Sequence, residues 1–71
     1  MIYNVYVGNF KEIQDCYETQ KKLNENYYSA KIVNLGIYFS LKVYMTQTYD
    51  EAYRVWKKLT DEGFQAQILN V

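Results

Sequence analysis

The spacing of apolar residues near the end of the chain predicts an α-helix followed by a β-strand. Between positions 49 and 59, apolar side chains recur at steps of three and four, so they form one stripe of a helix. They are Tyr49, Ala52, Tyr53, Trp56 and Leu59. Gly63 follows where the helix must end, because glycine takes the left-handed conformation without a steric penalty. Beyond it, Phe64 and Ile68 belong to an alternation with glutamines that is typical of a half-buried strand.

A second, weaker helical stripe covers positions 12–24. Its expected inner face contains Ile13, Cys16, Tyr17, Gln20 and Leu23. Asn24 and Asn26 are expected to end this helix, because asparagine tolerates the left-handed region. The later helix has a stronger start signal. Thr48 and Glu51 have the spacing of a capping box, in which each side chain satisfies a free backbone N–H.

The two halves of the chain are related by an internal repeat of about 36 residues. Shifting the second half back by this length aligns Tyr53, Leu59 and Ala66 with Tyr17, Leu23 and Ala30. The shift keeps the helical stripe and the strand alternation in phase together. We therefore interpret it as a true repeat, with halves at 1–35 and 37–71.

The element order is βαββαβ, with strands expected at 3–8, 28–35, 37–44 and after Gly63. Right-handed crossovers interleave two βαβ units into a four-stranded antiparallel sheet with both helices on one face. The sequence thus predicts one α+β domain over 1–71, a ferredoxin-like (RNP-like) βαββαβ sandwich. The strand residues expected beneath the helices are Tyr3, Val5, Val7, Tyr28, Ala30, Ile32, Phe39, Leu41, Val43, Phe64, Ala66 and Ile68. Cys16, the single cysteine, is expected as a small core residue.

The opposite face of this sheet stays uncovered, and its expected residues carry hydroxyls, amides, two lysines and three aromatic rings but no carboxylate. They are Ile2, Asn4, Tyr6, Ser29, Lys31, Val33, Tyr38, Ser40, Lys42, Tyr44, Gln65, Gln67 and Leu69. Such a surface suits a ligand with apolar faces and polar edges, as in glycans and single-stranded bases. A purely structural interpretation also stands, in which the tyrosines serve only cross-strand packing.

Composition narrows the functional classes. The formal net charge is zero, which gives no support to a nucleic-acid partner. The chain has no histidine, no metal-ligand spacing, no phosphate-binding glycine loop and no carboxylate pair facing a cleft. We therefore expect no enzyme, no catalytic residue, no metal site and no cofactor. No leader and no membrane-spanning apolar run is present, so the chain as written is expected in the cytoplasm, or in the cell envelope if it is part of a longer exported protein.

Nearly the whole chain resembles a SPOR domain, the sporulation-related repeat. The resemblance lies in the two tandem βαβ units, in the first strand ending Val5-Tyr6-Val7-Gly8-Asn9-Phe10, and in the closing segment from Leu59 to Ile68. It departs from the family at Tyr6, where a glutamine is frequent, and at Tyr44-Met45-Thr46, where a Gly-Pro-Phe-like corner is usual. The resemblance implies non-catalytic binding of peptidoglycan glycan strands stripped of their stem peptides, in bacterial cell division or sporulation. The resemblance also implies that the binding surface is the open sheet face. Its candidate glycan-binding residues in this chain are Tyr6, Lys31, Tyr38, Ser40, Lys42 and Gln67.

Two other classes remain open. An RNA-recognition motif has the same element order, and Val5 to Phe10 also resembles its first ribonucleoprotein strand. Its second signature would lie at Leu35 to Phe39, which lacks the leading basic residue and has aliphatic Ile37 in place of a stacking ring. The third class is a protein-interaction module or homodimer, in which an exposed sheet edge pairs with another chain.

Overall fold

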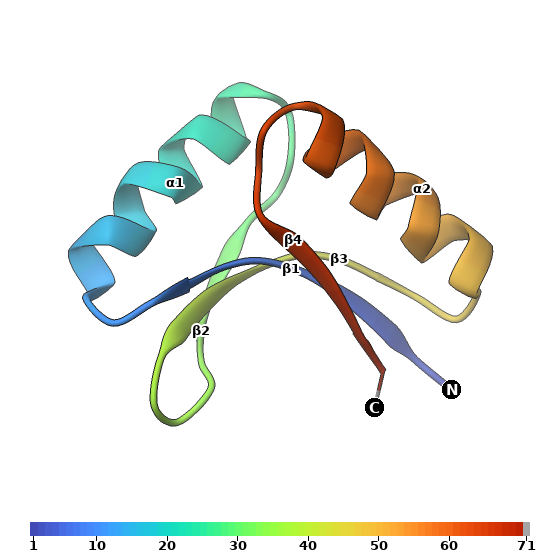
Figure 1. Ribbon diagram of the computed structural model, residues 1–71, viewed down its shortest axis with the longest axis horizontal. Helices are drawn as coiled ribbons and strands as arrows, with labels where there is room; N and C mark the ends of the chain where they lie inside the picture. Colours follow the sequence, from blue (N-terminus) through green and yellow to red (C-terminus); the bar gives the residue numbers. More distant parts are fainter. Residues whose placement is uncertain (71) are drawn as a thin grey trace.

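The computed structural model describes residues 1–70, and it confirms the predicted fold class. The elements are β1 (Tyr3–Phe10), α1 (Ile13–Glu25), β2 (Lys31–Asn34), β3 (Phe39–Thr46), α2 (Tyr49–Asp61) and β4 (Ala66–Asn70). The four strands form one antiparallel sheet in the order β2-β3-β1-β4. Each βαβ unit therefore leaves room for one strand of the other unit, and both helices cover the same face (Figure 1). Val71, the last residue of the predicted second repeat, lies outside the described residues.

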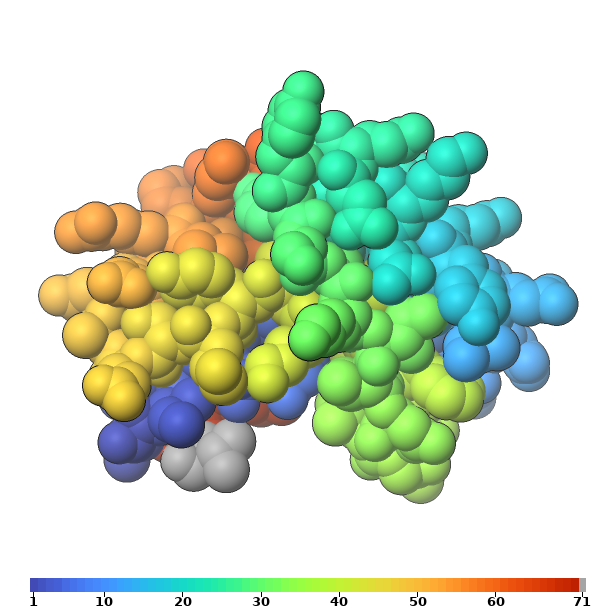
Figure 2. Space-filling model, turned by 180° about the vertical axis from the view of Figure 1, so that it is seen from behind, coloured from blue at the N-terminus to red at the C-terminus, as the bar shows by residue number. Residues whose placement is uncertain are grey.

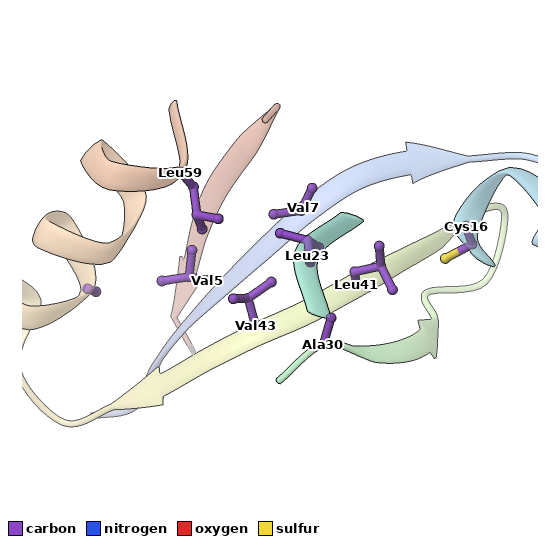
Figure 3. Packing of buried hydrophobic residues seen from close by; sticks show 9 residues of the cluster. Val5, Val7, Cys16, Leu23, Ala30, Leu41, Val43 and Leu59 are labelled. Carbon is purple, nitrogen blue, oxygen red and sulfur yellow. The ribbon is translucent and has the colours of Figure 1, made fainter. Parts of the chain in front are cut away.

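The core lies between the helices and the central strands β1 and β3. Its buried residues are Val5, Val7, Cys16, Leu23, Ala30, Leu41, Val43, Ala52 and Leu59 (Figure 3). All twelve strand residues predicted beneath the helices belong to this cluster or pack against it. The fully buried Cys16 is confirmed as a core residue, and burial raises the pKa of its thiol. Alternation along the strands therefore predicted the buried face of the sheet correctly.

Two hydrogen bonds occupy equivalent positions in the predicted repeat halves. Gln20 in α1 donates from Nε2 to the carbonyl oxygen of Ala30 at 2.9 Å. Trp56, its equivalent in α2, donates from Nε1 to the carbonyl oxygen of Ala66, also at 2.9 Å. Each bond ties the middle of a helix to the strand segment that follows it. The polar Gln20 in the weaker stripe thus has the same role as the indole N–H of Trp56.

The helical stripes are narrower than the sequence predicts. Tyr17, Tyr49 and Tyr53, expected on the inner faces, are 53%, 52% and 45% exposed. Ile13, also expected there, is 38% exposed. The small residues Cys16 and Ala52, one position before Tyr17 and Tyr53, are fully buried against the sheet instead. In α2 the rings instead lie against each other, with Tyr49–Tyr53 and Tyr53–Trp56 centroids 6.4 and 5.6 Å apart.

The predicted capping box at the start of α2 is wrong. The side chain of Thr48 makes no capping hydrogen bond. The carboxylate of Glu51 instead accepts hydrogen bonds from the hydroxyls of Tyr44 at 3.0 Å and Thr46 at 2.9 Å. Glu51 thus joins the helix to the end of β3, and its carboxylate raises the pKa of Tyr44.

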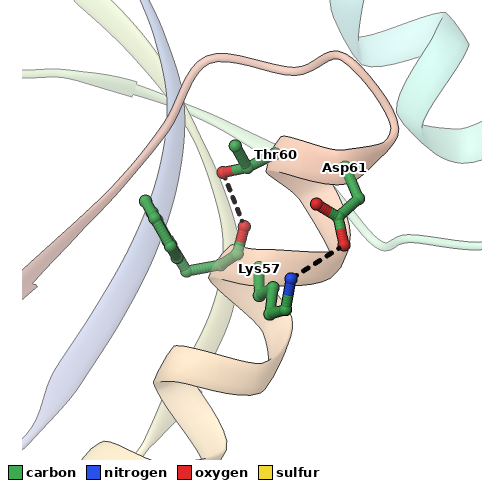
Figure 4. A network of polar contacts seen from close by, with 4 residues as sticks. Lys57, Thr60 and Asp61 are labelled. Atoms are coloured by element: carbon green, nitrogen blue, oxygen red, sulfur yellow. Dashed lines mark hydrogen bonds and ion pairs between the residues drawn. The ribbon is translucent and has the colours of Figure 1, made fainter.

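Both helices end in the same hydrogen-bonded turn, which is a Schellman motif. In α1 the N–H of Tyr28 bonds to the Leu23 carbonyl at 3.0 Å, and in α2 the N–H of Phe64 bonds to the Leu59 carbonyl at 3.0 Å. The left-handed residue is Gly63 in α2 (φ 93°) and Tyr27 in α1 (φ 68°). The prediction that asparagine ends α1 in this conformation is therefore wrong. In the last turn of α2, Lys57 and Asp61 form an exposed ion pair and Thr60 bonds to the Trp56 carbonyl (Figure 4).

Tyr27→Gly should raise the free energy of unfolding by about 1 kcal/mol. A left-handed conformation is strained for any residue with a Cβ, and Tyr27 is 99% exposed, so glycine removes strain without removing packing. The matched change is Gly63→Ala at the equivalent position, where open space surrounds the new Cβ, and it should lower stability by about the same amount. Urea unfolding followed by Trp56 fluorescence measures both. Changes of the same sign in the two unfolding free energies would contradict the conclusion that both helices end in the same turn.

Tyr28 joins the two helix ends. Its hydroxyl donates to Oε1 of Glu62 at 2.7 Å, and the Lys58 ammonium lies 5.2 Å from the centre of its ring. Burial and, after it, the bond to Glu62 raise the pKa of Tyr28 above the usual tyrosine value. The neutral phenol is therefore favoured in the folded state.

This shift predicts a loss of stability at alkaline pH. A folded-state pKa above the unfolded value stabilises the protein fully below about pH 10, the unfolded pKa, and this contribution is lost as the pH rises through the folded pKa. Tyr28→Phe introduces the residue found at the equivalent position 64, and it removes this pH-dependent contribution to stability. Urea unfolding at pH 8, 10 and 11 should show a steeper decline for the wild type. Equal declines in the unfolding free energy of the two proteins would show that Tyr28 does not cause the loss of stability.

Candidate functional site on the open sheet face

The open face is the side of the sheet that the helices leave uncovered. Figure 1 shows the sheet as an arch beneath α1 and α2, with the β2–β3 hairpin at one foot. The start of β1 and the end of β4 lie at the other foot. The open face is thus the inner side of the arch, a shape that suits an extended ligand.

Four of the six carried-over candidates lie in one row across this face. The strand register pairs Lys31 with Lys42, Lys42 with Tyr6, and Tyr6 with Gln67. The row therefore contains one side chain from each strand, in the order β2-β3-β1-β4. Neighbouring strands are about 4.8 Å apart, so the row is about 14 Å long. Sequence alternation predicted the face of these residues, and the register shows that they are direct neighbours.

A shallow pocket lies at each end of the row. The pocket at the β4 end is lined by Gly8, Asn9, Gln65, Ala66 and Gln67. The pocket at the β2 end is larger and is lined by Ser29, Lys31, Lys42, Val43, Tyr44 and Met45. Tyr6 lies between the two, so one elongated molecule could contact both pockets and the ring.

The other two candidates are placed differently. Tyr38 is half-buried and lies four residues before Lys42, about 13 Å along the strand, so a ligand that touches both Tyr6 and Tyr38 must be extended. Ser40 is fully buried, and its hydroxyl lies 2.7 Å from the Gly8 carbonyl and 3.2 Å from that of Val7. Its side chain has no surface with which to contact a ligand. The Ser40 hydroxyl instead hydrogen-bonds to the Val7 and Gly8 carbonyls, next to the irregular pairing of β1 with β3.

Bulges in the sheet explain where the predicted open face is wrong. Between Val5 and Tyr6, β3 has one extra residue, Val43, so Val5 pairs with Tyr44. Beyond this bulge the alternation of β3 is reversed, and Tyr44 reaches Glu51 on the helix side. Met45, which the sequence did not place on the open face, pairs with Asn4 there. The Oδ1 atom of Asn4 is buried and has no hydrogen-bond partner within residues 1–70.

One further contact residue follows from the structure alone. Asn9 accepts a hydrogen bond from Nε2 of Gln67 at 3.2 Å and lines the same pocket. It was not predicted, because a strand ending at Gly8 leaves Asn9 in a turn. The structure continues β1 to Phe10 through a second irregularity at Gly8, whose φ is 80°. The pair Gly8-Asn9 within an otherwise regular strand was the available sequence signal.

The acidic residues are confined to one side of the molecule. All eight acidic residues lie in the helices or next to their ends. Lys31 and Lys42 on the open face make no ion pair within residues 1–70. The open face is thus locally positive although the formal net charge of the chain is zero. The described residues contain no group of three metal-binding side chains, and neither of their helices is long and apolar enough to cross a membrane.

Comparison with known proteins identifies a structural neighbour. No protein-family model and no curated protein sequence matches this chain. The chain superposes on the solution structure of the peptidoglycan binding domain of the B. subtilis cell wall lytic enzyme CwlC with a TM-score of 0.82. The match covers 96% of this chain and 86% of that domain at 15% sequence identity. The two proteins therefore share a fold.

Proposed function

We propose that this chain is a non-catalytic module, similar to SPOR domains, that binds the glycan strands of peptidoglycan through the open sheet face. The observation that carries the proposal is the continuous row Lys31, Lys42, Tyr6 and Gln67. Its central ring offers an apolar surface to a sugar face, and its amide and ammonium groups can bond to hydroxyls and acetamido groups.

The fold supports the same conclusion. The neighbour described above is the peptidoglycan-binding part of a wall lytic enzyme, and its fold extends over nearly the whole of this chain. The row crosses all four strands, so its contacts are spread along one direction. This arrangement suits a linear polymer. A wall ligand also implies that the chain acts in the cell envelope.

The test is retention of the purified chain on peptidoglycan sacculi. One preparation is intact, and the other is treated with an amidase that removes the stem peptides. We expect retention that rises on the stripped glycan, since its sugars are no longer shielded by peptides. A single-stranded RNA is the parallel ligand. RNA binding without wall binding would replace this proposal with the RNA-recognition alternative, and binding to neither ligand would contradict both.

A further inference from the structure

We infer that Lys31 and Lys42 form a subsite for a carboxylate of the ligand, the lactyl carboxylate of N-acetylmuramic acid. The inference rests on the proposed function and specifies which chemical group of the glycan is recognised. Lys31 and Lys42 are direct cross-strand partners on the open face. Both line the larger of the two pockets, at the β2 end of the row.

The pairing of the two lysines is unfavourable without an anion. Like charges directly opposite each other on neighbouring strands destabilise a sheet. No acidic residue within residues 1–70 makes an ion pair with either lysine, and the carboxylates lie on the helix side. An anion bound between the two ammonium groups would turn this repulsion into two charge-assisted hydrogen bonds. The two lysines therefore provide two donors and a positive field, and residues 1–70 supply no acidic partner for them.

The pocket around the lysines favours an anion that is attached to an organic group. The exposed residue Met45 lines it together with the lysines, so an apolar side chain lies beside the charges. Figure 2 views the molecule with the β2 edge of the sheet in front, where the green β2 segment lies beside the yellow end of β3. Lys42 also pairs with Tyr6, so an anion here would belong to a ligand that lies on the Tyr6 ring.

The chemistry of a wall glycan supplies one such group. N-acetylmuramic acid carries a lactyl ether whose carboxyl is amide-linked to the stem peptide. Removal of the peptide frees this carboxylate, whereas N-acetylglucosamine has no acidic group. The lysine pair would therefore distinguish stripped glycan from intact glycan by the free carboxylate on the sugar itself, in addition to any steric effect of the peptide.

The experiment compares three ligands in solution: stripped glycan strands, the same strands with their carboxyl groups converted to amides, and chitin oligosaccharides. We expect amidation to weaken wild-type binding about tenfold, and Lys31→Gln/Lys42→Gln to weaken binding to the untreated strands by the same factor. Amidation should then have no further effect on the double variant. The charge-matched control is Lys21→Gln/Lys22→Gln on the exposed side of α1, which should bind like the wild type.

The outcomes separate the two proposals. Equal binding of the wild type to stripped strands and to amidated stripped strands would overturn the carboxylate subsite and leave glycan binding intact. A folded Lys31→Gln/Lys42→Gln variant that binds stripped, unamidated strands like the wild type would also overturn the subsite. The variant should fold, because it removes a like-charge pair, and urea unfolding checks this. Failure to bind all three ligands would overturn both proposals.

Discussion

Tyr6→Ala should weaken binding to stripped glycan strands at least tenfold while leaving the fold intact. Tyr6 lies at the centre of the row, with Lys42 on one side and Gln67 on the other. Its ring is half-buried on the open face and is not part of the core beneath the helices. Central aromatic residues are typical binding hot spots, where truncation costs about 2 kcal/mol or more. Titration of the folded variants with glycan fragments measures the change.

Two variants make the Tyr6 prediction specific. Tyr6→Phe keeps the ring and should retain most of the affinity, since stacking needs the ring and not the hydroxyl. Tyr17→Ala removes an equally large, 53% exposed ring from α1 on the other side of the molecule, and it should bind like the wild type. Unchanged affinity of a folded Tyr6→Ala variant would exclude Tyr6 from the site.

Gly8→Ala should destabilise the domain by about 3 kcal/mol, a large fraction of the stability of a domain this small. Gly8 has a φ of 80°, which is strained for a residue with a side chain. An alanine Cβ would also collide with the ring of Phe10, which packs against the core, so the ring would have to move. Urea unfolding monitored by Trp56 fluorescence measures the loss.

Gly36→Ala provides the matched control for Gly8→Ala. Gly36 also has a positive φ, of 101°, but no atom lies within 4 Å of the position that an added Cβ would take. Only the backbone strain should therefore appear, about 1 kcal/mol. The double variant Gly8→Ala/Phe10→Ala should lose less than the sum of its single changes, because the collision is absent. Equal destabilisation by Gly8→Ala and Gly36→Ala would show that Phe10 does not constrain this bulge.

Gly8 also connects the fold to the site. Its N–H bonds to the Gln65 carbonyl at 2.9 Å, and its carbonyl lies 2.7 Å from the Ser40 hydroxyl. These contacts hold the irregular part of β1 against both neighbouring strands and define the pocket next to Gln67. Gly8→Ala should therefore also weaken glycan binding at the β4 end of the row.

Periodicity predicted what depends on regular alternation and missed what depends on its interruption. The βαββαβ order and the strand residues beneath the helices follow this alternation. The row Lys31, Lys42, Tyr6 and Gln67 also follows it, because the extra residue Val43 comes after Lys42 in β3. Tyr44 was misplaced because the extra residue Val43 reverses the alternation of β3. Register is set between strands, so a bulge leaves little signal in one strand's own sequence.

Side-chain competition explains the remaining differences. Glu51 has the spacing for a capping box, but two hydroxyls at the end of β3 take its carboxylate. Ser40 has the alternation of an exposed residue, but the carbonyls at Gly8 and Val7 take its hydroxyl. Tyr27 takes the left-handed position at the end of α1 that Gly63 takes at the end of α2, although a tyrosine carries no sequence signal for this conformation. The first two differences depend on hydrogen-bond partners in other elements, which the periodicity of one element does not indicate.

Chemical-shift mapping of the ¹⁵N-labelled chain with stripped glycan fragments tests the central claim most directly, because it locates the ligand without any substitution. We predict that the largest changes occur at the backbone amides of Tyr6, Lys31, Lys42 and Gln67, with small changes along the outer sides of α1 and α2. Changes concentrated on the helices, or an unchanged spectrum at saturating glycan, would contradict binding through the open face.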